Sequence, residues 1–91
     1  MATRIWVARL DVSPATSEKL SSIHGLDADE IRQQVVCVAG LPFKWHDHPE
    51  RGPRAILFVQ IRGMKVLVVL YPAHDAIGDA WNLGSAYEVQ G

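Results

Sequence analysis

A chain of 91 residues, of which 48% are hydrophobic, can build one core, so we expect residues 1–91 to form a single domain and not a disordered chain. Nine basic and ten acidic residues give a net charge of −1, which excludes the overall basic excess of a dedicated nucleic-acid binder and leaves only a local basic patch for that role. The single cysteine, Cys37, excludes an internal disulfide, and we expect it to be buried as a small apolar side chain.

The apolar segments are short. The start, Met1–Trp6, lacks the apolar run of a secretory signal, and the longest apolar run, Val66–Tyr71, is far shorter than the ~20 residues that cross a bilayer. We therefore expect a cytoplasmic protein that makes no membrane contact.

The first expected element is a strand over Ile5–Leu10, with Ile5 and Val7 pointing to one face and Trp6, Ala8 and Leu10 to the other. A helix should follow, because Ser13 is a good N-cap and Pro14 suits the first helical position. Gly25 should end this helix in the left-handed conformation.

A second helix is expected to begin directly afterwards. Asp27 and Glu30 have the spacing of a capping box, and Leu26 and Ile31 have the spacing of a hydrophobic staple. These signals predict a helix from 28 to about 36.

The rest of the chain reads as strands. A two-residue turn at Arg62-Gly63 predicts a hairpin, and a loop is expected over 72–78. The expected strands cover 43–47, 54–61, 64–71 and 80–89. The prediction is therefore an α+β fold: an N-terminal strand, two helices, then an antiparallel sheet of three to four strands.

Both faces of the central hairpin are apolar. The helices can cover one face only, so we expect a second copy or a different protein to cover the other, as a homo- or hetero-oligomer such as a dimer.

Three segments together resemble the BrnT-type toxins of the RelE-like ribonuclease superfamily. They are the step from His24-Gly25 into Leu26–Ile31, the hairpin Arg54–Tyr71, and Leu83–Ala86. The resemblance implies a RelE/BrnT-like fold and the toxin component of a type II toxin–antitoxin system. It implies a metal-independent endoribonuclease without a cofactor, whose partners are RNA and a cognate antitoxin protein.

One position departs from that family. BrnT-type toxins usually carry an arginine where this chain has Tyr87. The difference removes a phosphate-stabilising group, so a catalytically silent module of the same fold, which pairs through its sheet with a partner or a second copy, remains the alternative.

Cleavage of RNA by its own 2′-hydroxyl needs a base, an acid and cations for the charged phosphorane. The candidate catalytic residues are Arg54, His24, His46, His48 and Tyr87. The candidate substrate-binding residues are Arg51, Lys44 and Ser85. Each of these residues could instead have an ordinary structural role.

The ordinary role of His24 is that of a histidine at the C-terminal end of a helix, where the negative end of the helix dipole favours a positive charge. The pair His46 and His48, with Asp47 between them, falls short of a zinc ligand set and can equally belong to a solvated loop, so no metal is predicted. Tyr87 can be an ordinary core or interface residue.

Overall fold

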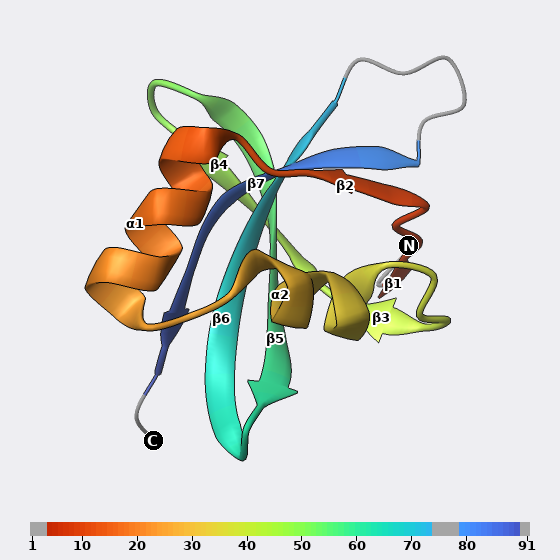
Figure 1. Ribbon diagram of the computed structural model, residues 1–91. Coiled ribbons are helices and arrows are strands. Elements are labelled where there is room, and N and C mark those ends of the chain that lie inside the picture. The colour runs from red at the N-terminus through yellow and green to blue at the C-terminus, as the bar shows by residue number, and fades with distance from the viewer. Residues whose placement is uncertain (1–3, 74–78, 90–91) are drawn as a thin grey trace.

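The computed structural model describes residues 4–73 and 79–89, which form a five-stranded sheet, a two-stranded sheet and two helices (Figure 1). The order in the large sheet is β2-β7-β6-β5-β4, and β1 pairs with β3 in the small one. The elements are β1 (Arg4–Ile5), β2 (Arg9–Asp11), α1 (Pro14–His24), α2 (Ala28–Val35), β3 (Leu41–Pro42), β4 (Lys44–His48), β5 (Gly52–Ile61), β6 (Met64–Pro72) and β7 (Ala80–Glu88). Most of the loop expected over 72–78 lies outside the described residues.

The α+β class was predicted, but the predicted sheet is wrong. The large sheet has five strands and is mixed, because β2 runs parallel to β7 while the other neighbours are antiparallel. The RelE/BrnT-like arrangement of one N-terminal strand and a wholly antiparallel sheet of three to four strands is therefore wrong as well. Alternation in a sequence shows which side chains are buried, but it carries no information about which strand lies alongside.

The predicted strand over residues 5–10 is broken into separate pairings. Ile5 pairs with Leu41 in the small sheet, and Val7 forms an isolated parallel bridge with Val36. Only from Arg9 onward does the chain join the large sheet, beside the start of β7. Each of these short pieces buries one apolar side chain, namely Ile5, Val7 and Leu10.

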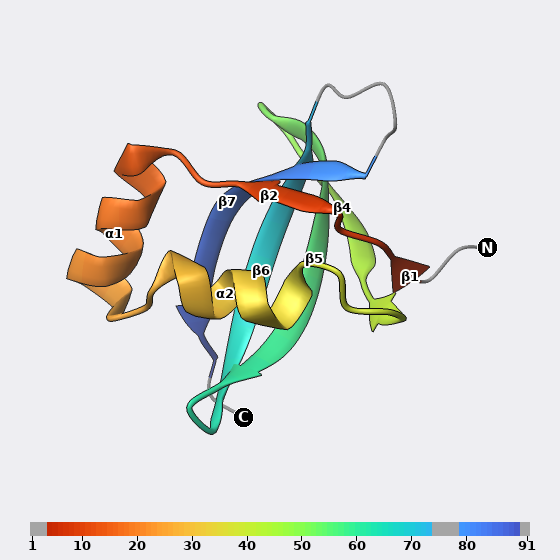
Figure 2. The same ribbon diagram turned by 45° about the vertical axis from the view of Figure 1, so that its right-hand side comes forward.

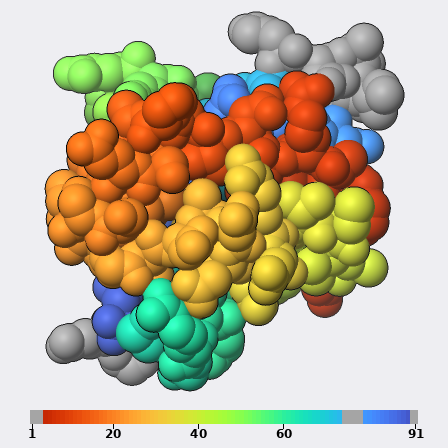
Figure 3. Space-filling view, in the orientation of Figure 1, coloured from red at the N-terminus to blue at the C-terminus, as the bar shows by residue number. Residues whose placement is uncertain are grey.

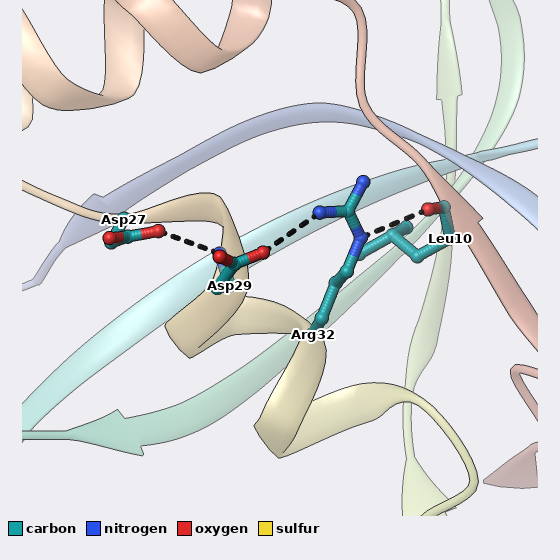
Figure 4. A network of polar contacts seen from close by, with 4 residues as sticks. All are labelled: Leu10, Asp27, Asp29 and Arg32. Atoms are coloured by element: carbon teal, nitrogen blue, oxygen red, sulfur yellow. Dashed lines mark hydrogen bonds and ion pairs between the residues drawn. The ribbon is translucent and has the colours of Figure 1, made fainter.

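Both helices begin and end where the local signals predict. The Ser13 hydroxyl accepts a hydrogen bond from the Thr16 backbone N–H at 3.2 Å, and Gly25 ends α1 with φ of 62°. Asp27 caps α2 by accepting from the Asp29 N–H at 2.8 Å (Figure 4). The glutamate of the predicted capping box, however, does not reach back to the cap: Glu30 forms an ion pair with Arg62 at 3.0 Å.

A short polar network joins α2 to the first strand of the large sheet. The Arg32 guanidinium donates to the Asp29 carboxylate at 3.1 Å and to the Leu10 carbonyl at 3.4 Å (Figure 4). α2 is thereby held next to β2 as well as against the sheet.

The core lies between the large sheet and α2, with α1 beside β7 (Figures 1 and 2). The space-filling view shows α1 and α2 side by side over this side of the molecule (Figure 3). The fully buried side chains include Leu20, Ile31, Val35, Leu57, Val66, Val68 and Leu70. In the described part of the chain, no helix is long and apolar enough to cross a membrane.

The face of the large sheet opposite α2, called the outer face below, carries several of the candidate site residues. Strand alternation and register place on it Lys44, His46, Arg54, Ile56, Phe58, Lys65, Leu67, Val69, Tyr71, Asn82, Ser85 and Tyr87. It is partly apolar, since the side chains of Phe58 and Tyr87 are 50% and 38% exposed.

The predicted side-chain alternation along the last strand is wrong at its middle. Regular alternation over the strand expected at 80–89 would place residues 81, 83, 85, 87 and 89 on one face, but the β6–β7 register shifts between Val69 and Leu70. Trp81 and Leu83 are buried in the core, whereas Ser85 and Tyr87 lie on the outer face. A β-bulge inserts one extra residue into a strand, so the side chains beyond it point to the opposite face from the one that regular alternation would give them.

Candidate functional site

A single arginine on β5 joins a histidine and a tyrosine across the outer face. Arg54 Nε donates to His46 Nδ1 on β4 at 3.1 Å, and Arg54 Nη1 donates to the Tyr71 hydroxyl on β6 at 3.4 Å. The positions follow from register: His46 pairs directly with Arg54, and Tyr71 lies one residue beyond the Ala55–Leu70 pair. The other N–H groups of the Arg54 guanidinium have no partner among the described residues, so they are available to a ligand.

A second arginine approaches the same tyrosine from the β4–β5 turn. His48 Nδ1 accepts from the backbone N–H groups of Glu50 and Arg51, both at 3.1 Å, which folds the turn back on itself. The Arg51 guanidinium carbon then lies 5.4 Å from the centre of the Tyr71 ring, a cation–π arrangement. The four residues Arg51, Arg54, Tyr71 and His46 are called the arginine–tyrosine cluster below.

The arginines change the acidity of the phenol. Burial raises the pKa of Tyr71, but the Arg51 and Arg54 guanidinium groups stabilise the phenolate, and the net pKa is lowered below the usual tyrosine value. Tyr71 therefore gives up its proton more readily than a solvent-exposed tyrosine. Groups with a perturbed pKa beside specific charges are common at functional sites, which makes Tyr71 a candidate for one.

The imidazole of His46 has a defined tautomer in its neutral form. Because Nδ1 accepts from a guanidinium that can only donate, the ring proton lies on Nε2. His46 therefore holds Arg54 in place with one nitrogen and presents an N–H donor with the other.

A shallow cavity of about 380 Å³ opens beside the cluster. This volume is within the ~300–1,000 Å³ typical of small-ligand sites. Its lining comes from α1, the β4–β5 turn and the strands β6 and β7: Thr16, Arg51, Tyr71, Asn82, Leu83 and Gly84. A ligand held by the arginines would have room for an attached group here.

The structure brings some predicted residues together. Arg54, His46 and Arg51 meet in the cluster, and Lys44 lies on the same face of β4, two residues before His46. Ser85 pairs with Val69, on the outer face and two residues from Tyr71. His48 belongs to the turn that carries Arg51, where its ring acts as a hydrogen-bond acceptor for the backbone.

Two predicted residues lie elsewhere. His24, at the end of α1, packs against Tyr87 with the ring centres 6.1 Å apart. Tyr87 pairs with Leu67, which precedes Tyr71 by four residues, about 13 Å along the strand. His24 and Tyr87 therefore form a pair of their own and are not part of the cluster.

Tyr71 was missed as a candidate, although a signal for it existed. Counting outward from the two-residue turn at Arg62-Gly63 places Tyr71 opposite Arg54 on the hairpin, with both side chains on one face.

Other predictions can be compared directly. Cys37 is exposed and has a left-handed φ of 59°, so the expectation that it is buried is wrong. Its backbone N–H bonds to the Val7 carbonyl at 2.8 Å, and this bond fixes the chain in a turn at the surface.

Within residues 4–73 and 79–89, no group of three or more His, Cys, Asp or Glu side chains is placed to hold a metal ion.

Comparison with protein-family models, with curated proteins and with solved structures finds no match to this chain. The functional argument below accordingly rests on the geometry of the arginine–tyrosine cluster.

Proposed function

We propose that this protein is a metal-independent endoribonuclease that acts as the toxin of a toxin–antitoxin pair, with the arginine–tyrosine cluster as its active site. The observation that carries the proposal is the bonded series His46–Arg54–Tyr71, with Arg51 against the same phenol. It combines two guanidinium cations with a phenol that can take up a proton and an imidazole N–H that can donate a hydrogen bond, and cleavage by the 2′-hydroxyl requires groups of these kinds.

The arginines are suited to the phosphate. In the reaction the 2′-oxygen forms a bond to the adjacent phosphorus while the bond to the 5′-oxygen breaks, and the phosphorane between these states carries an extra negative charge. The free N–H groups of Arg54 can bind two phosphate oxygens through the planar fork, and Arg51 adds a second cation. Both interactions strengthen as charge develops, so they favour the transition state.

We assign the uptake of the 2′-hydroxyl proton to Tyr71 and the hydrogen bond to the leaving oxygen to His46. With its lowered pKa, Tyr71 is the group that accepts the proton of the 2′-hydroxyl as phenolate. The neutral His46 Nε2–H donates a hydrogen bond to the leaving 5′-oxygen, and this oxygen takes a proton from solvent water as the P–O bond breaks, while Tyr71 later returns the proton of the 2′-hydroxyl to solvent. The products are a 2′,3′-cyclic phosphate and a 5′-hydroxyl, and no water is consumed.

The test is cleavage of a single-stranded RNA by the purified protein in the presence of EDTA. The wild type should produce fragments that end in 2′,3′-cyclic phosphate, and Arg54→Ala should lower the cleavage rate about 10²–10³-fold, as loss of a transition-state donor does elsewhere. Arg62→Ala is the matched control: it removes the same charge roughly 25 Å along the hairpin and should leave the rate unchanged. Equal rates for Arg54→Ala and the wild type would refute the site.

The toxin role is tested in cells. Expression of the wild type alone should slow bacterial growth, and Arg54→Ala should relieve the effect at equal protein level. Absence of any growth defect at good expression would contradict the toxin role without deciding whether the purified protein cleaves RNA.

A second candidate is supported by a separate observation. Phe58 and Tyr87 leave large apolar surfaces exposed on the outer face, beside Leu67 and away from the cluster. Such a surface suits a catalytically silent module that pairs through its sheet with a second copy or a partner. Light scattering distinguishes the states: a dimer that Phe58→Ser converts to monomers supports pairing through this face, and a wild-type monomer contradicts self-pairing.

A further inference from the structure

The Tyr71 ring lies directly against the backbone of β7 at Gly84. A Cβ atom added at Gly84 would lie 2.3 Å from Cε2 and 2.7 Å from Cδ2 of Tyr71, closer than real Cβ atoms approach other atoms. The φ of Gly84 is not in the left-handed region, so the backbone there does not itself demand glycine. What glycine supplies at this position is space for the ring.

Gly84 is also the extra residue of the β-bulge. Leu70 pairs with Leu83 and Val69 pairs with Ser85, so the register passes over Gly84. Bulges bend a strand locally and redirect the side chains around it, and they are frequent beside active sites. Here the bulge lies next to the tyrosine whose hydroxyl bonds to Arg54.

We propose that Gly84 is a positioning residue: the bulge and the missing side chain form a seat on which the Tyr71 ring lies, so that its hydroxyl meets Arg54 and its ring meets Arg51. The role of this seat in catalysis rests on the proposed function, whereas the close approach of the Tyr71 ring to Gly84 is observed in the structure. Gly84 also lines the cavity beside the cluster, so a larger residue would both displace the ring and narrow the ligand space.

Displacing the ring has a defined consequence. The Arg54–Tyr71 bond is already 3.4 Å long, near the limit for a hydrogen bond, so a shift of less than 1 Å breaks it. The phenol would then lose the stabilisation that the arginines give its ionised form. Arg54 would keep its bond to His46, because that bond involves β4 and β5 alone.

The test is Gly84→Ala, read by the ionisation of Tyr71. The chain has two tyrosines, so a Tyr87→Phe background leaves Tyr71 as the only phenol to titrate by ultraviolet absorbance. We expect Gly84→Ala to move the Tyr71 pKa up towards the usual tyrosine value and to lower RNA cleavage as far as Tyr71→Phe does. Gln60→Ala, an exposed position on β5 outside the cluster, is the control and should leave the titration unchanged.

Two further outcomes keep the test decisive if Gly84→Ala fails to fold. In a Tyr71→Ala background the added methyl meets no ring, so the double variant should fold and should be at least as stable as Tyr71→Ala alone; failure to fold would overturn the proposal. An unchanged Tyr71 titration in folded Gly84→Ala would overturn it as well. Neither readout requires RNA cleavage. A wild-type protein that does not cleave RNA would therefore refute the proposed ribonuclease activity but not the proposed role of Gly84 in positioning Tyr71.

Discussion

Replacing Tyr71 by phenylalanine separates the structural role of this residue from its proposed chemical role. The substitution removes one oxygen and keeps the ring against Gly84 and beside Arg51. The bond that is lost is 3.4 Å long and only partly buried, and the Arg54 donor that it frees can be solvated. Its contribution should therefore fall at the low end of the usual range, about 0.5 kcal/mol. For a domain of this size that corresponds to a fall in Tm of about 2–4 °C.

The effect on cleavage should be much larger. Loss of a proton-transfer group costs typically ~10²–10⁴ in rate. Affinity for the phosphate should change less than about twofold, since the neutral phenol carries no charge and both arginines remain. Urea unfolding measures the first quantity, and single-turnover cleavage over a range of protein concentrations separates the rate from the binding constant.

Two results would refute this reasoning. Destabilisation by more than about 2 kcal/mol would mean that the cluster holds the sheet together, because a single long and partly buried bond cannot supply that amount. Unchanged cleavage would mean that Tyr71 transfers no proton, and the assignment of the base would pass to another group.

Three other predictions concern the α2 cap, the Arg62–Glu30 ion pair and the ionisation of Tyr71. Asp27→Ala should destabilise the protein by about 0.5–2 kcal/mol through loss of the α2 cap, measured by urea unfolding, with cleavage unchanged; wild-type stability would contradict the cap. Arg62→Ala loses the partly exposed ion pair to Glu30 and the hydrogen bond to the Gly25 carbonyl, and should cost about 1–2 kcal/mol in all; a much larger loss would contradict this estimate. Phosphate affinity should fall as the pH rises through the lowered pKa of Tyr71, because the phenolate adds a negative charge beside the arginines; Tyr71→Phe should lack this step in isothermal titration, and a step of equal size in that variant would assign it to another group.

The parts of the fold that follow from short-range signals were predictable from the sequence. The Ser13 and Asp27 caps and the Gly25 stop act within a few residues. The turn at Arg62-Gly63 has positive φ at both positions, as a two-residue hairpin requires. Local chemistry of this kind is sufficient to fix where helices and turns begin and end.

The pairings between distant segments were not predictable in this way. Arg9–Asp11 lies alongside Ala80–Asn82 from the opposite end of the chain, and no residue in either segment specifies the other. The bulge at Gly84 depends on the fit of the Tyr71 ring, which is a tertiary contact. The site was only partly predictable for the same reason. The sequence identifies Arg54 and His46 as separate candidates, but their hydrogen bond depends on the register between β4 and β5.

The central claim is that the arginine–tyrosine cluster binds the scissile phosphate of RNA. It is tested most directly by nuclear magnetic resonance of the labelled protein, titrated with a short RNA whose attacking 2′-hydroxyl is replaced by hydrogen so that it cannot be cleaved. Our account predicts that the side-chain signals of Arg51 and Arg54 shift first and most, together with the rings of Tyr71 and His46. Shifts confined to Phe58 and Tyr87, or no shift at all, would contradict it.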